Sequence, residues 1–294
     1  MVKLADRPLG VYEKALPPAP WPELLGRASS LGFDFVEMSI DESDERLARL
    51  DWSKEERKAF VTAVLESGVR VPSVCLSGNR RYPLGSEDSA IRRRGVELIR
   101  KGVDLSIDIG VRTIQLAGYD EYYNETNAET RVLFGSSLAE AVEYAASRGV
   151  MLSMEVMDTR FMSSISRFLY YRERIPTPWF SVYPDLGNLS AWNDNAAEEL
   201  ELGLRLGVVA AVHLKDTYAV TAEEPGQFRD VPFGEGCVDF PKLFRVLKEN
   251  GYTGHFLMEM WNRRGEADVE EVTGARDWIV ALLRAADDEG SGAN

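Results

Sequence analysis

Eight short runs of apolar and β-branched residues recur along this sequence, and longer amphipathic stretches separate them. Alternation of this kind is typical of βαβ units, in which consecutive strands lie parallel and helices cover the sheet. Several runs are almost continuously apolar, as expected for strands that are buried on both faces. We predict strands at residues 9–13, 33–39, 69–77, 113–117, 151–156, 180–185, 208–215 and 255–261.

The length of 294 residues fits either one large barrel or two ordinary domains. No Pro-, Gly- or Ser-rich linker separates the eight repeats, which favours one closed barrel. A doubly wound open sheet would carry a Gly-rich phosphate loop after its first strand, and residues 11–15 contain no glycine. We therefore predict a single-domain (β/α)8 TIM barrel over residues 1–287, followed by a disordered tail at residues 288–294.

Local signals mark helix ends between the predicted strands. Ser53 and Glu56 have the spacing of a capping box, and Gly68 is placed to end the same helix. After the seventh predicted strand, residues 218–230 form a long polar segment. Loops of this length in compact domains are usually functional or mobile.

Composition disfavours several classes of function. The formal net charge is −14, with acidic residues spread along the chain, so a nucleic acid would be repelled. No apolar run approaches the roughly 20 residues of a membrane span, and residues 1–8 lack a secretory h-region. Cys75 and Cys237 lack the spacing of a disulfide framework or a thiolate zinc site. We expect a cytoplasmic protein that binds neither nucleic acid nor membranes.

Four polar residues interrupt apolar runs near the C-terminal ends of four consecutive predicted strands, and they are Glu155, Asp185, His213 and Glu259. These strand ends meet at one mouth in a barrel, so the four side chains can become neighbours. Burying an unpaired carboxylate is costly, and three of them beside one imidazole need a shared source of compensation. A divalent cation provides that compensation.

Any one of the four could instead be hydrogen-bonded inside the protein or salt-bridged, for example to Lys215. Four such residues at equivalent positions of consecutive strands favour a single cation that all four bind. Three carboxylates and one imidazole form a mostly hard donor set that suits Mn²⁺, Mg²⁺ or Zn²⁺ and leaves positions open for a substrate. The sequence therefore predicts a metal-dependent enzyme.

Longer motifs resemble a known family along nearly the whole chain. They lie at residues 9–16, 32–39, 114–120, 184–192, 232–236 and 258–261. The sequence resembles the L-xylulose 5-phosphate 3-epimerases, also called L-ribulose 5-phosphate 3-epimerases, of the sugar isomerase TIM-barrel superfamily. The resemblance implies a barrel that binds one divalent metal through a Glu, an Asp, a His and a second Glu, which match the four residues above.

The resemblance also implies a reaction. Interconversion of L-xylulose 5-phosphate and L-ribulose 5-phosphate removes the proton at C3, beside the carbonyl, and returns one to the opposite face. A metal would act as a Lewis acid on an enediolate, and we expect Zn²⁺ or Mn²⁺, with Mg²⁺ and Co²⁺ as alternatives. Glu155 and Glu259 are then the expected proton carriers. We further expect the enzyme to be a homodimer.

A phosphorylated sugar needs a cationic pocket at the same mouth. Lys14 follows the first predicted strand, while Ser77, Arg80 and Arg81 follow the third, so these four residues are predicted to bind the phosphate. Glu37, at the end of the second strand, is expected to contact sugar hydroxyls or an arginine in the barrel mouth.

Two features depart from the family pattern. Asn79 stands where related enzymes often have a histidine, and residues 218–230 are longer than the corresponding loop. The first bears on phosphate affinity or sugar preference. The longer loop at residues 218–230 bears on the form of a lid over the site.

Other functions compete with this one. A metal-dependent 3-epimerase or isomerase of unphosphorylated ketoses, or a related sugar-phosphate isomerase, would use the same metal set. A metal-dependent endonuclease that shares this barrel is disfavoured because the chain has two histidines and a net charge of −14. A catalytically silent sugar-phosphate-binding protein is disfavoured by the presence of both glutamates.

Overall fold

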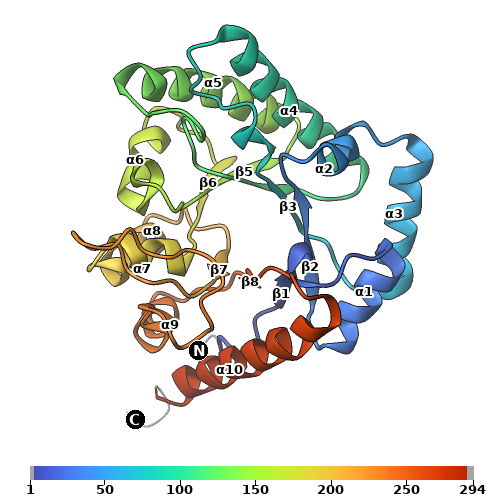
Figure 1. The fold of residues 1–294 in the computed structure, drawn as a ribbon, viewed down its shortest axis with the longest axis vertical. Helices are drawn as coiled ribbons and strands as arrows, with labels where there is room; N and C mark the ends of the chain where they lie inside the picture. Colours follow the sequence, from blue (N-terminus) through green and yellow to red (C-terminus); the bar gives the residue numbers. More distant parts are fainter. Residues whose placement is uncertain (1–2, 290–294) are drawn as a thin grey trace.

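The computed structural model describes residues 3–289, and its centre is an eight-stranded sheet that curls into a barrel (Figure 1). Neighbouring strands are parallel and follow the order β6-β5-β4-β3-β2-β1-β8-β7. All eight predicted strands are present, and each is shorter than predicted. The strands are β1 (Leu9–Tyr12), β2 (Phe35–Ile40), β3 (Ser73–Leu76), β4 (Thr113–Leu116), β5 (Met151–Glu155), β6 (Phe180–Tyr183), β7 (Val212–Leu214) and β8 (Phe256–Met258).

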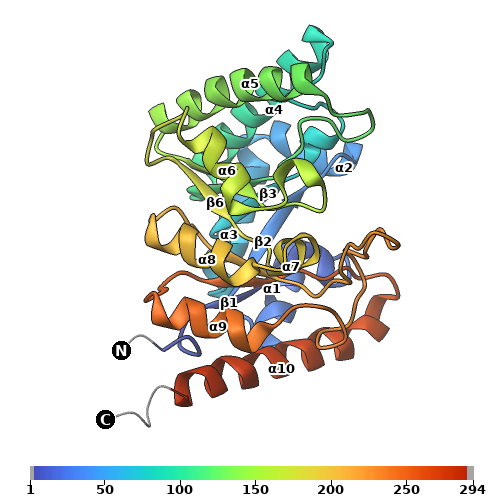
Figure 2. The same ribbon diagram turned by 90° about the vertical axis from the view of Figure 1, so that its left-hand side faces the viewer.

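Helices surround the barrel in both views (Figures 1 and 2). Together the elements form one (β/α)8 TIM barrel, so the predicted fold class is confirmed. The helices are α1 (Trp21–Ser30), α2 (Asp44–Leu47), α3 (Lys54–Ser67), α4 (Ser89–Asp108), α5 (Ala128–Ser147), α6 (Ile165–Arg172), α7 (Leu186–Trp192), α8 (Ala196–Arg205), α9 (Phe240–Glu249) and α10 (Val269–Asp288). Single 3₁₀ turns are η1 (Glu13–Ala15), η2 (Ala48–Asp51), η3 (Gly78–Arg80), η4 (Arg160–Met162) and η5 (Gly265–Asp268).

The barrel closes between β6 and β7 through separate bridges, because this edge has no continuous ladder. One bridge joins Val182 to Val209, and a second joins Asp185 to His213. The backbone N–H of His213 donates to the carbonyl of Pro184 at 2.9 Å. Closure at this edge therefore sets Asp185 beside His213, two residues predicted to share a ligand.

Helix ends follow the local sequence signals. The N–H of Ser53 donates to Glu56 Oε2 at 2.7 Å, and the N–H of Glu56 donates to Ser53 Oγ at 3.2 Å. Gly68 follows α3 with φ of 71°, the left-handed conformation that favours glycine. The capping box and the helix stop predicted for this segment are both confirmed.

A small cluster of buried side chains packs separately from the main core, and its members are Tyr12, Phe35, Cys75 and Leu257. A side chain at Gly10 would collide with this cluster, because its Cβ would lie 2.2 Å from the Phe35 ring. The absence of a side chain at Gly10 thus leaves room for the ring of Phe35 inside the barrel. Tyr12 and Cys75 also line the cavity described below, so the cluster forms part of that cavity's wall.

The two ends of the described chain meet, since the N–H of Leu4 donates to Asp287 Oδ1 at 2.9 Å. Helix α10 continues to Asp288, one residue into the predicted tail. Residues 290–294 of that predicted tail lie outside the described residues. Within residues 3–289, no helix is both long enough and apolar enough to cross a membrane.

Candidate metal centre and active site

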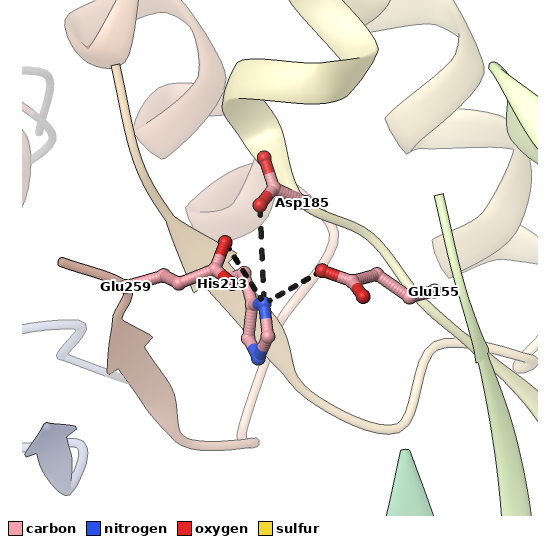
Figure 3. A group of neighbouring side chains, drawn as sticks. All are labelled: Glu155, Asp185, His213 and Glu259. Atoms are coloured by element: carbon pink, nitrogen blue, oxygen red, sulfur yellow. Dashed lines mark hydrogen bonds and ion pairs between the residues drawn. The ribbon is translucent and has the colours of Figure 1, made fainter. Parts of the chain in front are cut away.

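Glu155, Asp185, His213 and Glu259 converge on one point at the C-terminal ends of the strands (Figure 3). Each residue offers one ligand atom, and these atoms all lie within 4.8 Å of one another. His213 Nδ1 lies 3.1 Å from Glu155 Oε1, 3.8 Å from Asp185 Oδ2 and 3.9 Å from Glu259 Oε2. All four side chains are buried. The structure therefore brings together the four residues that the strand ends predicted as neighbours.

The backbone fixes this arrangement. Glu155 is the last residue of β5, His213 is the central residue of β7, and Glu259 directly follows β8. The N–H of Glu259 donates to the carbonyl of Leu214 at 2.9 Å, which extends the pairing of β7 and β8. The cluster thus stands on strands and strand ends of the barrel.

Asp185 uses its two carboxylate oxygens differently. It is the N-cap of α7, where its Oδ1 accepts from the N–H of Asn188 at 2.7 Å. Its Oδ2 is buried and accepts no hydrogen bond of good geometry, although Lys215 Nζ lies 3.0 Å away. Buried acceptors are normally satisfied, so this oxygen marks a position that a cation would fill.

Lys215 is the cation of the cluster in this structure. Its Nζ lies 3.0 Å from Asp185 Oδ2 and 3.0 Å from Glu259 Oε2. Burial would raise the pKa of Glu259, but the positive charges of Lys215 and His213 outweigh burial and lower this pKa to about 2. Two cationic side chains therefore face three buried carboxyl groups in this cluster.

Burial outweighs the positive charges at the other two carboxyl groups. It raises the pKa of Asp185 to about 7, because the ammonium of Lys215 only partly offsets it. Burial also raises the pKa of Glu155, with a further contribution from the charge of Glu259. A divalent cation bound among the four side chains would favour their ionised forms. The donor set therefore fits a hard or borderline divalent metal.

Glu37 lies on the far side of the imidazole and has no exposed surface. Its Oε1 is 3.3 Å from His213 Nε2, and its Oε2 accepts from Ser73 Oγ at 2.5 Å. We expected Glu37 to contact sugar hydroxyls or an arginine. In the structure both of its oxygens contact barrel side chains, and Glu37 is absent from the residues that line the cavity described next.

A cavity opens beside the cluster and holds several of the predicted substrate-binding residues. Lys14, Ser77 and Arg80 line it, together with Glu155 and Glu259. The guanidinium of Arg80 lies 5.4 Å from the ring centre of Tyr119 and 5.1 Å from that of Tyr122. The remaining lining residues are Tyr12, Cys75, Met157, Asp158, Asn188, Lys215, Phe228, Arg229 and Trp261.

Arg81 does not line this cavity. It points to the surface, where its Nη1 lies 2.5 Å from Asp44 Oδ1. Residue Asn79 is buried, and its Nδ2 donates to the carbonyls of Tyr82 and Gly95. The structure therefore does not bring Arg81 to the cavity with the other three predicted phosphate-binding residues, and the side chain of Asn79 packs between α4 and the preceding turn.

Sequence reasoning named Lys215 only as a possible salt-bridge partner and did not assign Gln115 or Arg229 to this site. Lys215 stands two residues after His213, so the period of a strand could have placed it on the same face. Gln115, whose Nε2 donates to Glu155 Oε2, interrupts the apolar run of β4 in the way that the four predicted residues interrupt theirs. Arg229 comes from the long polar loop, where no periodic pattern indicates its direction.

Comparisons with known proteins identify the family and the fold of this chain. The family model for a xylose isomerase-like TIM barrel matches residues 25–282. The L-ribulose-5-phosphate 3-epimerase UlaE of Escherichia coli O157:H7 is 54% identical over 280 residues, which cover 95% of this chain and 96% of that protein.

Solved structures extend the likeness of fold. D-Psicose 3-epimerase from Clostridium cellulolyticum H10, solved with D-tagatose, aligns with a TM-score of 0.76 at 16% identity, over 94% of this chain and 99% of that one. A xylose isomerase-like TIM barrel protein from Mycobacterium smegmatis, solved in complex with magnesium, aligns with a TM-score of 0.71 at 17% identity, over 97% and 99%. Fold, full-length identity and the shared barrel model lead to one conclusion: this chain is an enzyme of the L-ribulose-5-phosphate 3-epimerase family, within the xylose isomerase-like TIM barrels.

Proposed function

We propose that this enzyme epimerises a pentulose 5-phosphate at C3, interconverting L-xylulose 5-phosphate and L-ribulose 5-phosphate. The observation that carries the proposal is the meeting of Glu155, Asp185, His213 and Glu259 beside a cavity that also contains Lys14 and Arg80. The name of the UlaE relative supports the same substrate.

One divalent cation would be held by Glu155, Asp185, His213 and Glu259, and when bound it would supply Lewis acidity toward the ketose oxygens. His213 would present Nδ1 to the cation, because the three carboxylates face this nitrogen. Zn²⁺ and Mn²⁺ fit the mixed nitrogen and oxygen donors, and Mg²⁺ or Co²⁺ are alternatives. The magnesium complex of the Mycobacterium smegmatis barrel supports a metal in this fold.

Glu155 and Glu259 would move the proton. They come from β5 and β8, and both reach the cavity that would hold the sugar. One carboxylate takes the proton from C3, which leaves an enediolate, and the other carboxyl group returns a proton to the opposite face. The pair then exchanges roles in the reverse direction.

Neighbouring groups would hold these carriers in place. Gln115 donates to Glu155, and Lys215 donates to Glu259 Oε2 at 3.0 Å. Glu37 would accept from Nε2–H of His213, which leaves Nδ1 with a free lone pair for a metal. Lys14, Ser77 and Arg80 would bind the phosphate end of the substrate.

We further propose that the enzyme acts in the cytoplasm as a homodimer. A sugar phosphate carries a doubly charged group that does not cross a lipid bilayer unaided, so its enzymes share its compartment. Sedimentation equilibrium of the purified protein would test the dimer, and a monomer mass at micromolar concentration would refute it.

The function is tested by following the turnover of L-ribulose 5-phosphate and free L-ribulose by NMR. The proposal expects conversion of the phosphorylated pentulose to its C3 epimer, with a kcat/KM at least about 10-fold above that for free L-ribulose. Turnover of the free sugar alone would refute the phosphate requirement. No turnover of either sugar by the metal-loaded enzyme would refute the proposed reaction.

A 3-epimerase of unphosphorylated ketoses is the second candidate. One observation favours it, because Lys14 Nζ lies 2.7 Å from Asp41 Oδ2 and its charge is already paired. With Lys14 paired, fewer cationic side chains of the cavity remain available to bind a phosphate group. The same comparison of the two substrates decides between the candidates.

A further inference from the structure

The long polar loop after β7 returns to the active-site cavity. Tyr218 pairs with Gln227 in an antiparallel bridge, so residues between them form a hairpin-like excursion. The two residues that follow this bridge, Phe228 and Arg229, line the cavity together with Glu155 and Glu259. The loop therefore contributes to the wall of the active site.

Buried contacts hold the base of this loop in one position. The carboxylate of Asp216 accepts from the N–H groups of Gly234 and Gly236 at 2.8 and 3.0 Å through Oδ2. Phe228 stacks on Trp192 of α7, with ring centres 6.1 Å apart and planes inclined by 28°. The loop is thus attached to the barrel on both sides of Arg229.

The turn after Arg229 is also specific. Asp230 has φ of 59°, a left-handed conformation that few residues other than glycine adopt, although Asp tolerates it better than most. Its carboxylate pairs with Arg263. Strained backbone of this kind is maintained only when surrounding contacts hold it, and here it directs the chain immediately beside the cavity.

Arg229 differs from most other cationic side chains of the cavity because it forms no ion pair with any described residue. Four cationic side chains line it, namely Lys14, Arg80, Lys215 and Arg229. Lys14 is paired with Asp41, and Lys215 is paired with Asp185 and Glu259. Among residues 3–289, no carboxylate oxygen lies within 4.0 Å of a side-chain nitrogen of Arg80 or Arg229. Within this described part of the chain, Arg80 and Arg229 are therefore the cavity cations without an ion pair, although Asp158 lines the same cavity and its charge acts on Arg80.

Both guanidinium groups rest on aromatic rings. Arg229 lies 4.8 Å from the ring centre of Trp261, as Arg80 lies over Tyr119 and Tyr122. Stacking restricts the guanidinium plane and leaves its N–H edges free, so little side-chain entropy is lost when an anion binds. Arg229 is also exposed, and a solute can reach it from the cavity mouth.

We propose that Arg229 is a specificity-determining residue that binds the terminal phosphate of the substrate together with Arg80. The proposal rests on the proposed function and deepens it, because it assigns the preference for phosphorylated ketoses to the loop after β7. A free ketose presents a neutral hydroxyl at that end and gains no charge-assisted hydrogen bond there.

The first test is binding of inorganic phosphate to the purified enzyme, measured by isothermal titration calorimetry. Arg229→Met keeps the length of the side chain and removes its charge, so the dissociation constant for phosphate should rise roughly 10- to 100-fold. Arg229→Lys should recover part of the loss. The matched control is Arg205→Met on α8, where the arginine is exposed and paired with Glu201, and this variant should bind like the wild type.

The second test compares kcat/KM for L-ribulose 5-phosphate and free L-ribulose. Arg229→Met should lower the value for the phosphate ester roughly 10- to 100-fold and change the value for the free sugar by less than about twofold. An equal loss for both sugars, or unchanged phosphate binding by calorimetry, would overturn the proposal. If the wild type turns over neither sugar, the proposed reaction fails, and the calorimetric result still decides the role of Arg229.

Discussion

His213 has a different partner on each ring nitrogen, and this asymmetry organises the whole cluster. Nδ1 faces three carboxylates, while Nε2 faces Glu37 alone. An imidazole that donates one N–H to a carboxylate is fixed in one tautomer and becomes a stronger ligand through its other nitrogen. A contact between Glu37 and Nε2 would therefore suit His213 to the proposed role of metal ligand through Nδ1.

Replacing Glu37 by Gln should weaken metal binding without disturbing the fold. The amide keeps an acceptor for His213 but lacks the negative charge, so metal affinity should fall roughly 10- to 100-fold. Titration of the metal-stripped protein with Zn²⁺ or Mn²⁺ by calorimetry measures the change. Glu198→Gln, at an exposed position of α8, is the control and should bind metal normally. Unchanged affinity in Glu37→Gln would contradict the role given to this residue.

Replacing Glu155 by Gln should abolish epimerisation, and so should replacing Glu259 by Gln. The proposed scheme needs both residues in each direction, one as base and the other as acid. General acid and base catalysis contributes a factor of roughly 10² to 10⁴, so kcat should fall at least about 100-fold in each variant. Turnover at saturating metal measures the loss, and circular dichroism checks the fold. Near-normal kcat in either variant would refute the two-carboxylate scheme.

Arg80 and Arg81 provide a pair of neighbouring substitutions with different expected outcomes. Arg80→Met removes a cation that lines the cavity, so KM for L-ribulose 5-phosphate should rise roughly 10-fold or more. Arg81→Met removes a surface ion pair with Asp44, which contributes little, and KM should change less than about twofold. Equal effects of the two substitutions would show that the cavity is misassigned.

The segment after β7 is held by hydrogen bonds to Asp216, and it also lines the cavity proposed to bind the substrate. Asp216, one residue past Lys215, places its carboxylate among the backbone N–H groups of the returning loop. Its Oδ1 accepts from the N–H of Thr217 at 2.9 Å, and its Oδ2 accepts from Gly234 and Gly236. A side chain at Gly236 would meet Asp216 Oδ1 at 2.0 Å, so glycine permits this close approach.

Asp216→Asn should release this loop. Either orientation of the amide points an NH₂ group at backbone N–H groups, so the variant should lose about 2 kcal/mol of unfolding free energy. Urea denaturation measures the loss, and Asp277→Asn, an exposed position on α10, is the control. KM for the phosphorylated substrate should rise as well, because Arg229 loses its support. A variant with unchanged stability and unchanged KM would contradict the anchoring role.

At the scale of elements, most of the architecture could be predicted from the sequence. Apolar runs and glycine stops identified all eight strands and the ends of α3, because burial on both faces leaves a strong local pattern. The predicted strand at residues 208–215 is regular only in β7, since the preceding residues pair with β6 through one isolated bridge, at Val209. Apolar composition cannot distinguish a regular ladder from such bridges.

The site was predictable where side chains stand on strands, and less so where they stand on turns. Arg80 ends the 3₁₀ turn η3 and Arg81 follows it, and successive side chains in such a turn point about 120° apart. Sequence order therefore placed both near the cavity, although only Arg80 lines it. Glu37 was predicted on the correct strand, but its direction depended on the packing of His213 and Ser73.

At the scale of the molecule, the barrel makes the chemistry possible. Four residues that span 105 positions of sequence, from Glu155 to Glu259, meet because the C-terminal ends of parallel strands share one mouth. The cations that would recognise a phosphate come from loops after β1, β3 and β7. In the proposed function, residues on strands and at strand ends would hold the metal, and loop residues would bind the substrate's phosphate.

The central claim is that a metal held by this quartet enables exchange of the C3 proton. It is tested most directly by NMR of L-ribulose 5-phosphate in D₂O with enzyme that is metal-loaded, stripped by chelation, and then reloaded with Zn²⁺ or Mn²⁺. The loaded and reloaded enzyme should place deuterium at C3 as the epimers interconvert, and the stripped enzyme should place none. Epimerisation without deuterium at C3, or full exchange by the stripped enzyme, would contradict the claim.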